Sequence, residues 1–248
     1  MRQAMIFAAG LGTRLRPLTD DRPKALVTAG GRTLLEIVLE RLAAAGFEHV
    51  VVNVHHFGEQ IIEWLTTHPT PMPVVVSDER QMLLDTGGGL RAARRLFADA
   101  PVLIHNVDIM SDAPLTKLYD EACSNGHTTL LTSDRSTSRY LLADEQSRLV
   151  GWTNIQTGEV RSEHEWVKQE MAEGGGQALR RCAFSGIHVI TPELLAEMEG
   201  WPERFSIIDF YLRMCARHAV MLHHAKQLRL LDVGKPEALA RAAEFCRE

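Results

Sequence analysis

A glycine-rich loop with two fixed positive charges follows the first apolar run of the chain, in the stretch MIFAAGLGTRLRPLTDDRPKALV. Gly10 and Gly12 permit left-handed backbone and close approach of another molecule, so the main-chain amides of this loop can surround phosphate oxygens. Arg14 adds a guanidinium that binds two oxygens at once, and Lys24 adds a second cation further along the same stretch. These residues predict a site for a phosphate-bearing ligand.

Two common phosphate-binding patterns do not fit the loop. A dinucleotide-binding fingerprint needs a third small residue where Leu15 stands, and a Walker loop needs Gly-Lys-Ser or Gly-Lys-Thr, which the chain lacks. The glycines alone fit an ordinary tight turn equally well. The two cations favour a site at which a triphosphate undergoes substitution.

An aspartate follows another apolar run, in VLIHNVDIMSD, where Asp108 comes at the end of a predicted strand. An aspartate in this position can simply cap a helix or form a turn. Beside a bound triphosphate it has a second use, because Mg²⁺ in proteins takes one or two carboxylates together with phosphate oxygens. Asp108 is therefore the first candidate metal ligand.

The elements that must position these residues alternate between short apolar runs and longer amphipathic segments, which indicates β-α units on a mainly parallel sheet. Strands are expected at residues 4–8, 49–54, 73–77, 102–105 and 128–132, and helices at 33–45, 58–66 and 90–97. Open α/β sheets bind ligands outside the carboxyl ends of their strands. The predicted fold is thus a Rossmann-like α/β sheet flanked by helices.

The chain becomes polar and irregular from Asp134 to Arg181, where TNIQTGEV predicts a hairpin and EGGGQ a mobile loop. After this region we expect a strand at 183–190, helices at 192–198 and 207–218, a strand at 229–233 and a helix from Pro236. No hexapeptide repeat predicts a β-helix at the C-terminus.

Composition and charge restrict the class of protein. A chain of 248 residues with 45% hydrophobic content is long enough for one domain with a large core. A net charge of −5 argues against binding to nucleic acid, and no apolar run has the length of a membrane span or of a signal peptide. The cysteines have neither metal-knuckle nor disulfide spacing; they are Cys123, Cys182, Cys215 and Cys246. We expect a protein of the reducing cytoplasm with no nucleic-acid or membrane partner.

The run AAGLGTRLRPLTDDRPKAL closely resembles the signature of the sugar-phosphate nucleotidyltransferases, the NDP-sugar pyrophosphorylase family. The resemblance implies the GT-A-like fold of nucleotide-diphospho-sugar transferases, as a single domain over residues 1–248. It implies a nucleotide-binding half at 1–133 and a sugar-phosphate-binding half at 134–248. The residues that would hold the triphosphate are Ala8, Gly10, Gly12, Thr13, Arg14 and Lys24.

The same resemblance supplies a partner for Asp108. Asp232, in LRLLDVGKPEAL, matches the Asp-x-Gly-x-Pro with which family members end their catalytic region. The resemblance implies that these two carboxylates share Mg²⁺. The family usually has Asn-Gly-Asp where this chain has Asn106-Val107-Asp108, and Val107 is expected to shift the backbone or narrow the pocket while leaving the carboxylate in place.

A second glycine run, in LLDTGGGLRAA, precedes a predicted helix. By itself a triple glycine is most simply a flexible turn. In the family this segment lines the nucleoside pocket, and short relatives that use uridine nucleotides carry a very similar acidic-Thr-Gly-Gly-Gly run. The resemblance therefore implies that Asp85, Thr86 and Gly87 bind the nucleotide, and it favours UTP. Asn53 ends a strand at the same sheet edge and is expected to contact the substrate.

The sugar-binding side has weaker patterns. AFSGIHVITPEL resembles the family strand beside the sugar phosphate, which implies contacts from Ser185 and Gly186, with Asn106 at a neighbouring strand end. Asp209, in FSIIDFYL, could bind sugar hydroxyls or cap a helix. Many relatives also carry Glu-Lys-Pro, whose lysine grips the sugar phosphate; Lys168, in Val-Lys-Gln, is the nearest candidate here and does not match that pattern.

Together these residues predict in-line attack of a sugar 1-phosphate on the α-phosphorus of a nucleoside triphosphate, with release of pyrophosphate. Arg14, Lys24 and Asp108 are the candidate catalytic residues, with Mg²⁺ as cofactor. The favoured substrates are UTP and N-acetylmuramate 1-phosphate or a similar hexose 1-phosphate. The sequence does not predict an oligomeric state.

Two alternatives remain open. A choline-phosphate cytidylyltransferase shares the N-terminal signature and would need an aromatic cage, for which Trp152, Trp166 and Trp201 are candidates. A catalytically silent nucleotide sensor would need no metal site, and the two aspartates and Lys24 count against it.

Overall fold

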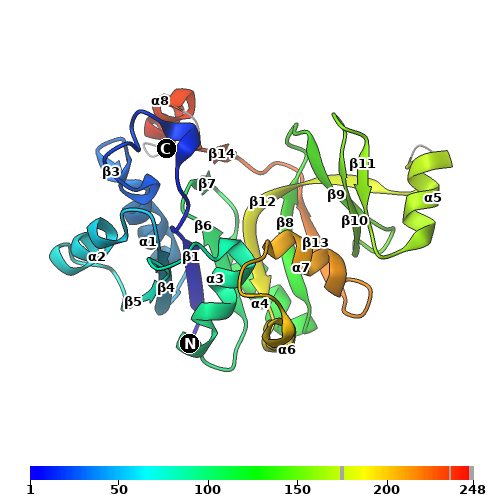
Figure 1. Cartoon of the computed structure of the whole chain (residues 1–248), viewed down its shortest axis with the longest axis horizontal. Helices are drawn as coiled ribbons and strands as arrows, with labels where there is room; N and C mark the ends of the chain where they lie inside the picture. The colour runs from blue at the N-terminus through cyan, green and yellow to red at the C-terminus, as the bar shows by residue number, and fades with distance from the viewer. Residues whose placement is uncertain (174–175, 235, 246–248) are drawn as a thin grey trace.

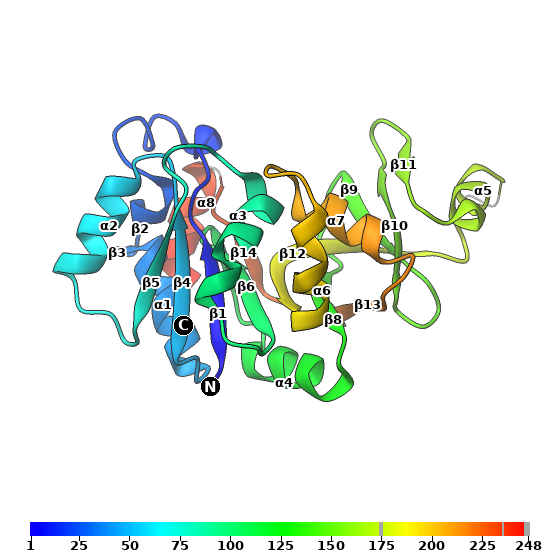
Figure 2. The same ribbon diagram turned by 60° about the horizontal axis from the view of Figure 1, so that its bottom comes forward.

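The chain forms a mixed ten-stranded sheet with helices packed on both faces, as Figures 1 and 2 show. The computed structural model describes residues 1–173, 176–234 and 236–245. Along the main path of the sheet the strand order is β11-β10-β9-β12-β6-β1-β4-β5, and β8 pairs with β12 and with β13 beside that path.

The strands of this sheet span Gln3–Phe7 (β1), His49–Val54 (β4), Val74–Asp78 (β5), Val102–Asn106 (β6), Thr128–Ser133 (β8), Arg139–Ala143 (β9), Leu149–Asn154 (β10), Glu159–Arg161 (β11), Arg180–Ile190 (β12) and Val220–Ala225 (β13). Two small ribbons pair Thr28–Ala29 (β2) with Arg32–Thr33 (β3), and Ile109–Ser111 (β7) with Leu230–Asp232 (β14). The α-helices are Leu34–Ala44 (α1), Gly58–Thr67 (α2), Asp85–Ala93 (α3), Leu115–Asn125 (α4), Glu165–Glu173 (α5), Pro192–Ala196 (α6), Ile207–Met214 (α7) and Pro236–Phe245 (α8). Short 3₁₀ turns lie at Thr13–Leu15, Lys24–Leu26, Arg94–Leu96 and Glu197–Gly200. No helix among the described residues has the length and apolar character needed to cross a membrane.

Two hydrophobic cores lie on opposite faces of the sheet. Ala4 and Ile6 of β1 belong to one core, with residues of α1 and α4, whereas Met5 and Phe7 belong to the other, with residues of α3, α6 and α7. A strand covered on both faces needs apolar residues at successive positions. This explains why apolar and polar residues do not alternate in β1 after Gln3. Packing on both faces therefore holds the sheet in place and gives the loops at its edge a rigid support.

Parallel pairing brings three of those loops together. β1 lies between β4 and β6 and runs parallel to both, so that Phe7 is in register with Asn53 and with Asn106. The segments that follow the three strands therefore leave the sheet side by side. This is the edge at which the sequence predicts a ligand site.

The long strand β12 joins the two parts of the sheet. It pairs antiparallel with β6 through Ile187–Ile190 and with β9 through Arg180–Cys182. Its pairing with β8 shifts register between Phe184 and His188, and Gly186 in this interval has a φ of 74°. The irregularity brings the buried backbone at Gly186 against Asn106, the last residue of β6.

The end of the chain returns to its beginning. β14 pairs with β7, which directly follows the end of β6, and α8 packs beside β2. Figures 1 and 2 show α8 next to the N-terminal loops rather than next to the strands β9, β10 and β11 that precede it in the sequence. Residues from both ends of the chain thus meet at one sheet edge.

The sequence-based expectations hold best in the first half. The expected strands there correspond to β1, β4, β5, β6 and β8, the first two helices to α1 and α2, and the strand expected at 229–233 to β14. The helix expected at 90–97 was misplaced, because α3 already begins at Asp85 and the glycine run forms its first turn. The helix expected at 207–218 ends earlier, at Met214.

The region expected to be irregular, 134–181, instead contains β9, β10, β11 and α5. β9 and β10 are short, and their buried apolar stretches, Leu141–Ala143 and Leu149–Val150, are only two or three residues long. The expected TNIQTGEV hairpin is confirmed as the connection between β10 and β11. Part of the EGGGQ loop and Cys246 lie outside the described residues.

Two histidines buried in the middle of the sheet make stability depend on pH. Burial lowers the pKa of His105 from 6.5 to about 4 and that of His188 to about 3. Among the described residues, neither ring nitrogen of His188 has a hydrogen-bond partner. Below pH 6.5 the unfolded chain therefore binds more protons than the folded chain, and the free energy of unfolding decreases as the pH falls toward these lowered values.

We predict that His188→Leu flattens this pH dependence. Each histidine that stays neutral in the folded state contributes up to about 1.4 kcal/mol per pH unit between its two pKa values. Urea unfolding of the unchanged protein and of the variant is measured between pH 7.5 and 4.5. The unfolding free energy of the variant should fall less with pH, since the carboxylates contribute equally to the pH dependence of both proteins. Parallel curves for the two proteins would contradict the burial of a neutral His188.

Candidate active site

A cavity of about 380 Å³ opens at the carboxyl ends of β1, β4 and β6. Its lining unites eight of the residues predicted from the sequence with four others: Phe7, Ala9, Gly10, Arg14, Lys24, Asn53, Leu83, Asp85, Thr86, Asn106, Asp108 and Arg204. Residues from five separate segments of the chain therefore meet at the predicted edge.

The glycine loop after β1 is held in shape by its own side chains. Gly12 has a φ of 67°, and a Cβ on it would lie 3.0 Å from the Thr19 methyl and 3.3 Å from Cβ of Lys24. The Thr19 hydroxyl donates a hydrogen bond of 2.8 Å to the Gly12 carbonyl. Glycine is required here because the left-handed backbone and the close packing both exclude a side chain.

Asn53 ties the loop to the rest of the sheet edge. Its Oδ1 accepts a hydrogen bond of 2.8 Å from the Ala8 amide, and its Nδ2 donates one of 2.7 Å to Oε1 of Glu79. Burial raises the pKa of Glu79. The Ala8 amide is thus already engaged by the protein, and Asn53 both lines the cavity and positions the loop. Glu79 was missed by the sequence analysis, since it follows a strand with no recognisable motif.

Two carboxylates and two cations form the charged part of the cavity. Nζ of Lys24 lies 2.7 Å from Oδ2 of Asp108, and Arg14 lies 3.7 Å from the same oxygen. The other side of the Arg14 guanidinium lies 3.6 Å from Oδ2 of Asp232. Asp108 is almost completely buried, whereas Arg14 is more than half exposed. The two predicted metal ligands therefore face one another across a single guanidinium.

Pairing of β7 with β14 brings these aspartates together. Asp232 is in register with Ile109, and the Val233 amide donates a hydrogen bond of 2.8 Å to the Asp108 carbonyl. The Gly234 amide donates to Oδ1 of Asp232 at 2.9 Å, which leaves Oδ2 directed at Arg14. The backbone therefore fixes the spacing of the two carboxylates.

The glycine run at the start of α3 is a packing device. The amides of Gly87 and Gly88 both lie within hydrogen-bond reach of the Phe205 carbonyl, at 2.9 and 3.3 Å. A Cβ on Gly87 would lie 2.3 Å from the Phe205 ring, and one on Gly88 would lie 2.2 Å from the Glu203 carbonyl oxygen. The run lets α3 approach the segment before α7 so closely that no side chain fits between them.

Asp85 and Thr86 reach the cavity at the start of this helix. Asp85 has a φ of 62°, and its Oδ1 accepts a hydrogen bond from the Thr86 amide at 2.6 Å. The Thr86 hydroxyl oxygen accepts one from the Ile207 amide at 2.9 Å. Arg204, which the sequence analysis missed, enters the cavity from the same segment before α7; a lone arginine in WPERFSIID carries no recognisable pattern.

The residues predicted for the sugar side are divided between two places. A Cβ on Gly186 would lie 2.7 Å from Nδ2 of Asn106, so the irregular part of β12 lies against the first cavity. Ser185 precedes it and is buried. Asp209 lies in a second cavity of about 310 Å³, where it pairs with Arg161.

Lys168 and the tryptophans do not assemble as the sequence alternatives require. Lys168 lies on α5, pairs with Glu165 at 2.6 Å and is absent from the lining of both cavities in the described part of the chain. Trp166 is exposed on α5, Trp201 packs on Phe205 and Phe210, and Trp152 lies under Arg161. No ring contact within the described ranges joins two of these tryptophans.

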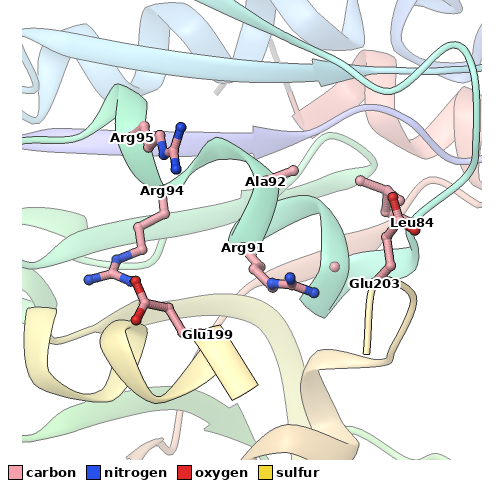
Figure 3. Close-up of a pocket in the computed structure, with 8 residues that line it drawn as sticks. Leu84, Arg91, Ala92, Arg94, Arg95, Glu199 and Glu203 are labelled. Atoms are coloured by element: carbon pink, nitrogen blue, oxygen red, sulfur yellow. The ribbon is translucent and has the colours of Figure 1, made fainter. Parts of the chain in front are cut away.

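A larger cavity, of about 610 Å³, lies on the other side of α3 (Figure 3). Figure 3 shows Arg94 and Glu199 pointing toward one another across it, and these side chains form an ion pair. Arg91 donates hydrogen bonds to the carbonyls of Trp201 and Pro202, at 2.8 and 2.9 Å. The polar groups of this cavity thus hold α3 to the segment after α6. Neither Asp108, Asp232 nor the glycine loop after β1 lines this cavity.

Comparisons with known proteins show the family to which the chain belongs. The family model described as nucleotidyl transferase matches residues 3–248, and the chain belongs to this family of enzymes. The chain is 32% identical over 238 residues to an N-acetylmuramate alpha-1-phosphate uridylyltransferase of Caulobacter vibrioides, which covers 95% of this chain and 93% of that protein. It is 31% identical over 200 residues to the protein of the same description from Neisseria meningitidis, covering 80% and 79% of the two chains.

A solved structure supports the fold. A UDP-glucose pyrophosphorylase from Acinetobacter baumannii superposes with a TM-score of 0.76 at 16% sequence identity, over 98% of this chain and 92% of that one. The predicted α/β fold, with its mainly parallel sheet and flanking helices, is confirmed, as is membership of the family that the N-terminal signature resembles.

We predict that Gly88→Ala damages the active site although it improves helix propensity. Alanine favours a helix interior over glycine by about 1 kcal/mol, but the new Cβ would collide with the Glu203 carbonyl and displace the adjoining Arg204. The expected result is a loss of about 1–3 kcal/mol in unfolding free energy and a raised KM for the triphosphate.

Gly200→Ala is the matched control, since a Cβ there would meet nothing within 4 Å. Chemical unfolding and steady-state assays of the two variants provide the comparison. A Gly88→Ala protein as stable and as active as the control would contradict the close packing of α3.

Proposed function

We propose that the chain transfers a nucleotidyl group from a nucleoside triphosphate to a sugar 1-phosphate and releases pyrophosphate. The observation that carries this proposal is the convergence of Asp108 and Asp232 on Arg14, beside Lys24 and the glycine loop, in one cavity. A catalytically silent nucleotide sensor would gain nothing from two carboxylates held at a fixed spacing.

The reaction needs positioning and charge stabilisation more than proton transfer. An oxygen of the sugar 1-phosphate, already anionic, forms a bond to the α-phosphorus, while the bond to the pyrophosphate oxygen breaks and that oxygen leaves with the electron pair. Arg14, Lys24 and Arg204 line the cavity as cations that offset the charge of the phosphates, and the loop around Gly10 offers backbone amides. No general base is required for such a nucleophile.

The donor set fits Mg²⁺. Two carboxylates at fixed spacing, completed by phosphate oxygens, match the way this ion is bound in phosphoryl-transfer sites, and larger groups of His, Cys, Asp or Glu able to hold a metal are absent from the described residues. We propose that Asp108 and Asp232 hold the ion. When bound, it supplies charge neutralisation at the reacting phosphate. Lys24 and Arg14 offset the two carboxylates in the protein alone and can turn to the phosphates of the substrate.

We further propose UTP as donor and N-acetylmuramate 1-phosphate as acceptor. The support is the description of the two relatives from Caulobacter vibrioides and Neisseria meningitidis, together with Asp85 and Thr86 at the cavity wall. A phosphocholine acceptor is disfavoured, because the described tryptophans form no cage. Residues 1–133 would bind the nucleotide and 134–248 the sugar phosphate, with β14 contributing Asp232 to the first part.

We place the enzyme in the cytoplasm, with no nucleic-acid or membrane partner. The three described cysteines, Cys123, Cys182 and Cys215, are free thiols, which suits a reducing compartment.

The test of function is a matrix of the five common nucleoside triphosphates against N-acetylmuramate 1-phosphate, other hexose 1-phosphates and phosphocholine. Pyrophosphate release is measured with and without Mg²⁺. We expect Mg²⁺-dependent release that is strongest with UTP and N-acetylmuramate 1-phosphate. Release with another sugar phosphate would change the acceptor, whereas silence in every combination would contradict the proposed function.

We predict that Asp108→Asn abolishes turnover while the protein stays folded. Loss of a group that merely orients a metal ligand costs about 10–100-fold, so loss of the ligand itself should exceed this. The Asp108 backbone still accepts from Val233, which preserves the local fold. Pyrophosphate release and circular dichroism provide the measurements.

The matched control is Asp120→Asn. This substitution removes an exposed carboxylate of α4 that pairs with Arg2. This variant should retain normal turnover. Undiminished release by Asp108→Asn would remove Asp108 from the mechanism.

A further inference from the structure

The second cavity gathers three arginines from separate parts of the chain. Arg135 follows β8, Arg139 begins β9 and Arg161 ends β11. The remaining lining consists of Thr137, Leu141, Trp152, Phe184, Ser206, Ile208 and Asp209. With a volume of about 310 Å³, the cavity is large enough for part of a small ligand.

The charges of this cavity are not balanced by the protein. Arg161 pairs with Asp209 and lies over the Trp152 ring at 5.5 Å from its centre. Arg135 makes one hydrogen bond, of 3.2 Å, to the Phe184 carbonyl, and Arg139 has no side-chain hydrogen bond or ion pair within the described ranges. Asp209 is the only carboxylate in the described lining. Arg135 and Arg139, both exposed to solvent, therefore line the cavity without a carboxylate partner among the described residues.

The two cavities are neighbours that share no lining residue. Arg204 lines the first and Ser206 lines the second, two residues further along one segment. Phe184 lines the second cavity, and Gly186, two residues later on β12, touches Asn106 of the first. The two cavities therefore lie side by side, each lined by residues of the same short stretches of backbone.

An acceptor that reacts in the first cavity must have its phosphate there. The first cavity already offers Arg14, Lys24 and Arg204 to that phosphate, so the arginines of the second cavity are free for a different part of the acceptor. A guanidinium presents two parallel N–H donors, which match the two oxygens of a carboxylate. Leu141, Trp152 and Phe184 add an apolar wall suited to the carbon skeleton of the acceptor.

We propose that Arg135 and Arg139 bind a second anionic group of the acceptor, a carboxylate remote from the 1-phosphate, and so select acidic sugar 1-phosphates. This inference rests on the proposed nucleotidyl transfer and adds to it the residues that select an acidic acceptor over a neutral one. Arg161 and Asp209 act differently: their ion pair holds α7 against β11 and shapes the cavity.

The test compares two acceptors that differ in this carboxylate, N-acetylmuramate 1-phosphate and N-acetylglucosamine 1-phosphate. We would measure kcat/KM with each acceptor at saturating UTP for three proteins. These are the unchanged protein, the double variant Arg135→Gln/Arg139→Gln and the control variant Arg148→Gln. Arg148 is a matched control because it is an exposed arginine paired with Asp144 outside the lining of the second cavity.

The expected result is a loss of about 10–100-fold with the acidic acceptor in the double variant, the usual effect of removing hydrogen bonds to a charged group. Activity with the neutral acceptor should change by less than about threefold, which also shows that the variant is folded. The control variant should match the unchanged protein with both acceptors.

Equal losses with both acceptors would overturn the inference, because the arginines would then serve the phosphate or the fold. Unchanged activity with both acceptors would overturn it as well. If the unchanged protein used the neutral acceptor as efficiently as the acidic one, the inference would fail while nucleotidyl transfer stood. Absence of pyrophosphate release with any acceptor would instead reject the proposed function.

Discussion

The site depends on one short antiparallel ribbon, in which β14 pairs with β7. Its hydrogen bond from the Val233 amide to the Asp108 carbonyl joins the end of the chain to the end of β6. Without this pairing Asp232 would have no fixed place near Asp108, and each carboxylate could rotate away from the other. The large parallel sheet supplies a rigid edge, but the small ribbon decides that two acidic groups meet there.

Bringing two carboxylates together has an electrostatic cost, which the loop after β1 offsets. Arg14 lies between the aspartates and Lys24 pairs with Asp108, so the cavity is close to neutral in the protein alone. Glycines make these approaches possible: a Cβ on Gly234 would lie 2.5 Å from the Arg14 guanidinium. The same cations then become available to phosphates, so the arrangement that stabilises the two carboxylates also prepares the cavity for a polyanion.

The sequence predicts which residues line the cavity better than it predicts the long-range contacts that bring them together. Apolar runs indicate β1 and β6, and the glycine loop with Lys24 indicates an anion site. The β7–β14 pairing joins segments far apart in the chain, and no local pattern encodes it. The family resemblance implied only that Asp108 and Asp232 meet. Arg204 belongs to no recognisable motif, and it reaches the cavity only because the fold places its segment beside α3. β9 and β10 were missed because their buried apolar stretches are only two or three residues long.

A double-mutant cycle on turnover tests the central claim, that Asp108 and Asp232 act as one unit. Rates of pyrophosphate release are measured for Asp108→Asn, Asp232→Asn and the double variant. Residues that serve the same bound ion have strongly non-additive effects, so the double variant should be no more than about threefold slower than the slower single variant. Losses that multiply would show independent roles and would contradict the shared site.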